Sequence, residues 1–179
     1  MADAMKLIGT VTLGSTATSI NFTSIPQTAT DLVILLSVRG DLFNPQIGHF
    51  LRFNGDTGSN YSDRQLSGNG STAASGSNGA GGTAIYTGQA PAATQTANIF
   101  GNTSIYIPNY TSSVAKSVSV DAVRENNSTA SAIFMVAGRW EGTAAITSLS
   151  IVCEASNWIA GSTASLYSIT KGSGGATVA

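Results

Sequence analysis

The stretch that decides the fold is DLVILLSVR at residues 31–39, which is apolar at nearly every position. A second stretch of the same kind is AIFMVAGRW at residues 132–140. Both are short and rich in β-branched residues, so they predict strands, with a buried helix as the alternative. Strands that are apolar throughout suit the centre of a sheet covered on both faces, either inside a sandwich or at a subunit contact.

Shorter segments around these two stretches alternate apolar and polar residues with a period of two, which is typical of half-buried strands. Ile20 and Phe22 share one face of residues 19–23, and Ile105 and Ile107 share one face before Pro108, which is expected to end that strand. Further strands are expected near residues 5–13, 48–54, 61–67, 84–87, 97–107, 145–153 and 163–170. The pattern predicts an all-β fold of roughly nine to eleven short strands, an antiparallel β-sandwich that is jelly-roll-like.

Residues 114–122 also alternate, with Val114, Val118, Val120 and Ala122 on the apolar face. Lys116 interrupts that face. Because a lysine can bury its aliphatic stem while its charge stays in water, we expect Lys116 to cover the rim of the sheet.

The chain is expected to form a single β-sandwich domain over residues 1–170, with a long Gly/Ser loop at 67–82. That segment has no large apolar side chain to anchor it, and loops of this length are usually functional or disordered. Residues 171–179 have the same composition and are predicted to be a flexible C-terminal tail. Either segment could become ordered against a neighbouring molecule in an assembly.

Charge is scarce in this chain: 9% of its 179 residues are charged, the net charge is −1, and it has one His and one Cys. With this net charge the chain has no broad positive field to attract nucleic acid and no polybasic segment to bind an anionic membrane. Neither nucleic acid nor a membrane is therefore expected as a partner. The early residues show no signal-peptide pattern, and synthesis in a cytoplasm is expected. Because proton transfer and metal chemistry draw on groups that are rare here, the composition favours a non-enzymatic structural or binding protein.

One segment, FNGDTGSNYSD at residues 53–63, gathers short oxygen-bearing side chains around glycines. Such side chains can ligate Ca²⁺, and Asp56, Asn60 and Asp63 are the candidate ligands. The alternative, which the residues favour, is ordinary turn chemistry of Asn, Asp and Gly. Apart from this possible Ca²⁺ site, no cofactor is expected. His49 and Cys153 are expected to be a hydrogen-bonded structural histidine and a buried apolar residue.

Three aromatic residues are candidates for an interface or for stacking on a glycan: Tyr110, Trp158 and Tyr167. Large flat side chains supply much contact area at small entropic cost. Filling the core is the alternative for each ring, and for Trp158 the two interpretations are equally supported.

The order of four segments is itself recognisable. They are residues 51–56 with 60–62, residues 105–110, Trp140 with residues 144–149, and residues 160–162 with 165–169. Over about residues 30 to 170 the chain resembles small virion structural proteins encoded by tailed bacteriophages. The resemblance implies a β-sandwich subunit of the virion, made in the cytoplasm of the bacterial host, with no catalytic residue to carry over.

These expectations lead to a non-enzymatic virion protein, first of all a capsid decoration or cement protein. Such a protein is expected to associate with itself as a homotrimer and to contact the major capsid protein or other virion proteins. Many weak contacts between repeated copies would then add up to a high avidity. The alternative is a receptor- or glycan-binding component of a tail or fibre. A hydrolase acting on host polysaccharide is the least favoured hypothesis.

Overall fold

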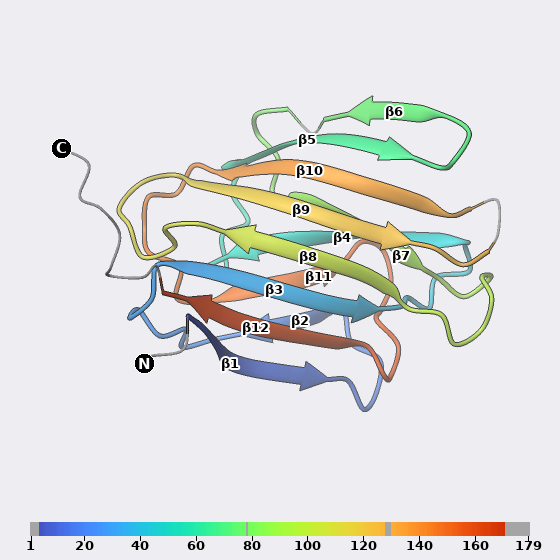
Figure 1. Cartoon of the computed structure of the whole chain (residues 1–179), viewed down its shortest axis with the longest axis horizontal. Helices are drawn as coiled ribbons and strands as arrows, with labels where there is room; N and C mark the ends of the chain where they lie inside the picture. Colours follow the sequence, from blue (N-terminus) through green and yellow to red (C-terminus); the bar gives the residue numbers. More distant parts are fainter. Residues whose placement is uncertain (1–3, 78, 128–129, 171–179) are drawn as a thin grey trace.

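The computed structural model describes residues 4–77, 79–127 and 130–170, and these residues form strands, turns and loops without a helix. Figure 1 shows the strands in sequence order. Their bounds are β1 (Met5–Thr12), β2 (Ser19–Phe22), β3 (Asp31–Val38), β4 (Gln46–Phe53), β5 (Tyr61–Gly68), β6 (Ala73–Gly76), β7 (Ile85–Pro91), β8 (Gly101–Ile107), β9 (Lys116–Arg124), β10 (Ala132–Trp140), β11 (Leu149–Cys153) and β12 (Thr163–Ile169).

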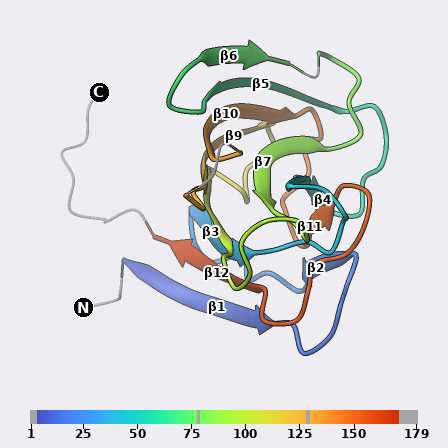
Figure 2. The ribbon, with the colours of Figure 1, turned by 90° about the vertical axis from the view of Figure 1, so that its right-hand side faces the viewer.

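The strands form two antiparallel sheets. The large sheet has the order β1-β12-β3-β8-β9-β10-β5-β6, and the small sheet has the order β2-β11-β4-β7. Figure 2 shows the large sheet curving around the small one. The all-β sandwich predicted from the sequence is therefore confirmed, whereas the finer expectation of a jelly roll stays a prediction.

The core lies between the two sheets and is built from the inward faces of almost every strand. Ile34 of β3 stands between Leu166 of β12 and Ile105 of β8 in the sheet register, and all three are fully buried. Ile20 and Phe22 are buried together as the period-two pattern predicted. Strand β8 ends immediately before Pro108, which confirms that expectation as well.

The two apolar stretches are central strands of the large sheet, β3 and β10, but each is covered on one face. On β10 the inward Phe134 and Val136 are buried, whereas Ile133 and Met135 face outward and are more than half exposed. Leu35 of β3 is exposed in the same way. The expectation of coverage on both faces is therefore wrong within one chain, because the small sheet covers a single side of the large sheet.

The Gly/Ser segment at 67–82 is shorter as a loop than the sequence predicted. Strand β5 continues to Gly68, and Ala73–Gly76 form β6, which pairs with β5 along the edge of the large sheet. Asn69 makes the turn between them, since its side-chain oxygen accepts hydrogen bonds from the backbone N–H groups of Ser71 and Thr72. Because backbone pairing needs no large side chain, the composition of this segment did not predict strand β6. The predicted tail at 171–179 lies outside the described residues.

Lys116 does not cover the rim of the sheet as predicted but is buried inside the sandwich. Its ammonium group donates hydrogen bonds to the carbonyl oxygens of Ser112, Val114 and Ala144, at 2.8, 2.5 and 3.0 Å. Val114 precedes β9 and its side chain is exposed, so it does not continue the buried face. The lysine thus ties two loops together at one end of the core.

Candidate functional site

The outward surface of the large sheet, called here the outer face, carries large apolar side chains that line up across strands. Leu7 of β1, Tyr167 of β12, Val33 of β3 and Tyr106 of β8 are consecutive partners in the sheet register. Leu7 is 51% exposed and Tyr106 is 36% exposed. Four neighbouring strands therefore present one continuous apolar row to the outside.

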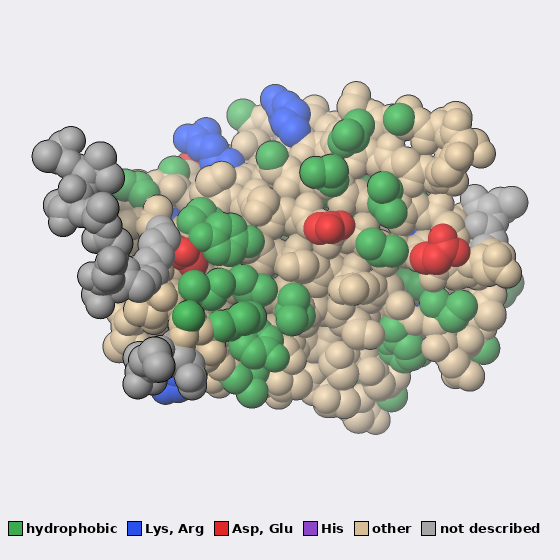
Figure 3. Space-filling view, in the orientation of Figure 1, with side chains coloured by type: hydrophobic (Ala, Val, Ile, Leu, Met, Phe, Trp, Pro, Cys, Tyr) green, Lys and Arg blue, Asp and Glu red, His purple; other side chains and the backbone are tan. Residues whose placement is uncertain are grey.

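A second apolar group lies on the same face over the other half of the sheet. Met135 of β10 pairs with Leu66 of β5, and Ile133 lies two residues away along β10. Leu66 and Met135 border a shallow depression of about 470 Å³ beside Arg64, and together with Ile133 they border a smaller one against β6. Figure 3 shows hydrophobic side chains gathered over β8, β3, β12 and β1, and a second group over β9, β10 and β5.

The charged and polar groups of the outer face lie between and beside these two apolar groups. Asp121 of β9 stands between Ser104 of β8 and Met135 of β10 in the register. Arg64 lies on β5, next to Ala137 of β10. The face therefore combines large apolar surface with charged groups of opposite sign on nearby strands, among them the Asp121 carboxylate and the Arg64 guanidinium.

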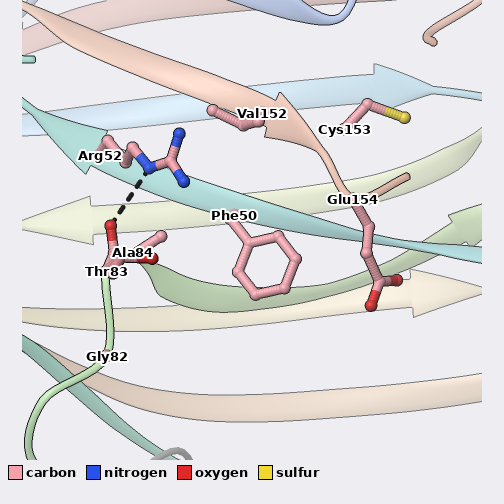
Figure 4. Close-up of a pocket in the computed structure, with 8 residues that line it drawn as sticks. All are labelled: Phe50, Arg52, Gly82, Thr83, Ala84, Val152, Cys153 and Glu154. Atoms are coloured by element: carbon pink, nitrogen blue, oxygen red, sulfur yellow. Dashed lines mark hydrogen bonds between the residues drawn. The ribbon is translucent and has the colours of Figure 1, made fainter. Parts of the chain in front are cut away.

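The small sheet carries a different kind of depression on its own outward surface, on the opposite side of the sandwich. Its volume is about 300 Å³, and its lining includes Phe50 and Arg52 of β4 and Glu154, which follows β11. Figure 4 shows the Phe50 ring between the side chains of Arg52 and Glu154. An aromatic ring, a cation and a carboxylate thus converge at one surface site.

Two hydrogen bonds hold the charged groups of this depression in place. One carboxylate oxygen of Glu154, Oε2, accepts from the backbone N–H of Gly48 at 2.9 Å. A side chain at position 48 would prevent this, because a Cβ on Gly48 would lie 2.5 Å from that oxygen. On the other side, Nε of Arg52 donates to the carbonyl oxygen of Thr83 at 3.1 Å, which is the dashed line in Figure 4.

Cys153 also lines this depression, and its thiol is not a reactive group. Burial raises the pKa of Cys153 to about 12, so the thiol stays protonated at neutral pH. The expectation that this cysteine acts as a small buried apolar residue is confirmed.

The three residues proposed as Ca²⁺ ligands do not come together. Asp56 accepts hydrogen bonds from the side-chain amide of Asn60, from the backbone N–H of Gly58 and from the indole Nε1 of Trp140. Asp63 lies on β5, where its carboxylate instead accepts from the backbone N–H of Tyr86 at 3.1 Å. The structure thus joins Asp56 and Asn60 in a hydrogen-bonded turn and leaves Asp63 outside it.

Two of the three aromatic residues proposed for glycan or interface contacts are core residues. Tyr110 and Trp158 are completely buried, so the prediction that they form stacking platforms is wrong. The Tyr110 hydroxyl donates to the carbonyl of Pro26, and the backbone of Trp158 bridges Ala17 and Gly40. Tyr167 lies on the outer face and is partly exposed, so it remains a candidate interface residue.

His49 is a structural residue, as predicted. Its Nδ1 lies 2.7 Å from the hydroxyl of Thr87, which donates its own proton to the His49 carbonyl, and its Nε2 lies 3.3 Å from the hydroxyl of Thr103. These roles assign the proton to Nδ1. Burial lowers the pKa of His49 to about 3, so the ring is neutral at physiological pH.

Comparisons of this chain with protein-family models, with curated proteins and with solved structures find no match. Within residues 4–77, 79–127 and 130–170, no helix is long and apolar enough to cross a membrane. Across the same ranges, no three His, Cys, Asp or Glu side chains gather in a way that could hold a metal ion.

Sequence reasoning missed the depression on the small sheet. The signal was present in β4, where Gly48, Phe50 and Arg52 alternate with buried residues and therefore share the outward face. Glu154 could not be joined to them, because β11 pairs with β4 across a long separation in the sequence.

Proposed function

We propose that this protein is a non-enzymatic structural subunit that associates with further copies of itself through the outer face of the large sheet. The observation that carries the proposal is the aligned apolar row of Leu7, Tyr167, Val33 and Tyr106. Soluble monomers rarely expose contiguous apolar surface of this kind, and larger exposed patches mark interaction sites. In this arrangement a neighbouring molecule covers the outward apolar side chains of β3 and β10.

The size of the outer face fits a stable contact. The large sheet has eight strands; at a spacing of about 4.8 Å and about seven residues per strand, its face measures on the order of 900 Å². A standard protein interface buries about 800 Å² on each partner. The face can therefore supply an ordinary interface without help from loops.

The charges of the outer face favour a second copy as the partner. Asp121 and Arg64 have opposite signs and lie on different strands of the outer face, so successive copies in a trimer could place the carboxylate of one copy near the guanidinium of the next. The low charge of the chain keeps repulsion between copies small.

The buried ionisable groups support a structural function in place of catalysis. His49, Lys116 and Arg39 are each buried and each bonded to neutral partners, the two cations to backbone carbonyls. Each of these groups helps to hold loops or strands together. Together with the resemblance to virion proteins of tailed bacteriophages, this favours a capsid decoration or cement protein of the virion, whose further partner is the major capsid protein.

The proposal is tested by the mass of the purified protein in solution and by its abundance in particles. Sedimentation velocity should show an oligomer, with a trimer as the expected form, and quantitative mass spectrometry of purified phage particles should find hundreds of copies per capsid. A protein that stays monomeric at high concentration, or that is missing from particles, would overturn the proposal. A few copies per particle would instead indicate a tail or fibre component.

A further inference from the structure

The depression on the small sheet has a floor and two walls of different chemistry. Phe50 of β4 forms the floor, and its ring is partly exposed. Arg52 lies on one side and Glu154 on the other (Figure 4). This surface faces away from the outer face of the large sheet, so both can be occupied at once.

We propose that this depression binds a saccharide, with one sugar ring stacked on Phe50 and its hydroxyl groups bonded to Arg52 and Glu154. The proposal goes beyond the structural function and does not depend on it. It also replaces the glycan platforms expected at Tyr110 and Trp158, which are buried.

The chemistry of the three side chains favours a sugar over an ion. Aromatic faces carry partial negative charge and attract the C–H groups on the apolar face of a pyranose. A carboxylate accepts hydrogen bonds and a guanidinium donates them, often in pairs, so together they match neighbouring hydroxyls, which do both. Because Glu154 and Arg52 have opposite charges, the site as a whole favours a neutral ligand.

Both charged groups keep hydrogen-bonding capacity for a ligand. Glu154 uses Oε2 to bind the backbone N–H of Gly48, which leaves Oε1 to accept from a hydroxyl. Arg52 uses Nε to bind Thr83, and its two terminal amino groups extend beyond that bond, on the side of Phe50 (Figure 4).

The floor of the site is held rigid by aromatic packing. The ring of Phe50 meets that of Tyr86 edge-on, with centroids 5.7 Å apart at an angle of 69°. Tyr86 in turn packs edge-on against Phe134 of the core, with centroids 6.2 Å apart. A site whose side chains are already ordered loses less conformational entropy when it binds a ligand.

The test is a titration of the ¹⁵N-labelled full chain, followed by NMR, with neutral hexose and N-acetylhexosamine oligosaccharides. At about 10 mM ligand, a site with a Kd near 1 mM is roughly nine-tenths filled. We expect saturable shifts at the amides of Gly48, Thr83 and Glu154 with at least one of these sugars. Glycine betaine, a zwitterion without hydroxyl groups, is the matched non-sugar probe and should cause none.

Variants then locate the contacts. Phe50→Leu keeps an apolar side chain without a flat ring and should weaken binding at least tenfold. Glu154→Gln and Arg52→Lys should each weaken it several-fold, and Gly48→Ala should do so without removing any binding group, because its Cβ displaces the Glu154 carboxylate. The control is Arg139→Gln with Glu141→Gln, which removes an exposed ion pair at the end of β10 and should leave binding unchanged.

Three results would overturn the proposal. One is the absence of saturable shifts with every sugar, and another is equal or stronger binding of glycine betaine. The third is unchanged sugar affinity in the Phe50, Arg52 and Glu154 variants when their melting temperatures show that they are folded. The oligomeric state of each variant is measured in parallel, so that failure of sugar binding is distinguished from failure of self-association.

Discussion

The indole Nε1 of Trp140 donates a hydrogen bond of 2.7 Å to Oδ2 of Asp56, and this contact joins the end of β10 to the turn after β4. The same carboxylate accepts from Asn60 and from the backbone N–H of Gly58. These three hydrogen bonds hold the pKa of Asp56 below its usual value, and the bond from Trp140 has the largest effect. The Asp56 carboxylate therefore already has three hydrogen-bond donors around it and does not need a cation to balance its charge.

The first prediction concerns Ca²⁺ at this turn. Because Asp56 is bonded to three donors and Asp63 is directed to Tyr86, millimolar CaCl₂ or EDTA should leave the melting temperature unchanged. Asp56→Ala should lower the free energy of unfolding by about 1–3 kcal/mol, since it leaves the indole N–H without its acceptor. A rise in melting temperature with Ca²⁺ that Asp56→Ala abolishes would restore the cation hypothesis.

The second prediction is a loss of stability in acid caused by His49. Its pKa is about 3 in the folded chain, against 6.5 when exposed, so below pH 6.5 the unfolded chain binds the additional proton. The contribution of His49 to the free energy of unfolding is therefore greatest above pH 6.5 and falls as the pH decreases toward 3. Between pH 7 and pH 5 the free energy of unfolding should fall by about 2 kcal/mol. Urea unfolding at several pH values measures this. His49→Gln should remove most of the slope between pH 7 and 5, and an unchanged slope would contradict the assignment.

The third prediction concerns the buried cation. Lys116→Met removes the donor to three loop carbonyls while keeping an apolar chain of similar length. The carbonyls lose their partner inside the protein, so the free energy of unfolding should fall by roughly 1–3 kcal/mol. Lys6→Met, at an exposed position on β1, is the control and should change it by less than about 0.5 kcal/mol. Equal effects of the two substitutions would show that the carbonyl contacts contribute nothing.

The fourth prediction tests the outer face. Met135→Lys and Leu7→Lys each place a charge in one of the two apolar groups and should shift the sedimentation coefficient toward that of the monomer. Both positions are exposed, so thermal unfolding of the monomer should change little. Phe43→Lys is the control, because this side chain is 90% exposed and lies in the loop after β3. If all three variants keep the wild-type mass, the interface lies elsewhere.

The fifth prediction concerns the close approach of β7 to the large sheet. Gly88 has a φ of +114°, and a Cβ there would lie 2.6 Å from the Cβ of Ala122 on β9. Gly88→Ala should therefore cost at least about 2 kcal/mol of unfolding free energy, from crowding and backbone strain combined. Gly14→Ala meets nothing within 4 Å and should be nearly neutral. Chemical denaturation of both variants makes the comparison.

The sequence alone predicted the strands and their buried faces, because a period of two is a local property of the chain. Ile20 with Phe22, and Ile105 with Ile107, are buried as their alternation indicated. The prediction from composition was wrong where a strand is held by its backbone hydrogen bonds. The small residues of β6 form a strand because they pair with β5. The sequence misplaced Lys116 because its acceptors come from the loop before β9 and from the loop after β10.

The tertiary structure decided which outward faces remain open and which distant residues share a surface. β3 and β10 were recognised as central strands, yet whether a second layer covers them depends on where the small sheet lies. The depression around Phe50 depends on pairing between β4 and β11, which brings Glu154 beside residues far away in sequence. The local alternation of residues determines which side chains share a face of each strand. Long-range pairing determines what covers that face, and the proposed functions depend on the faces that stay open.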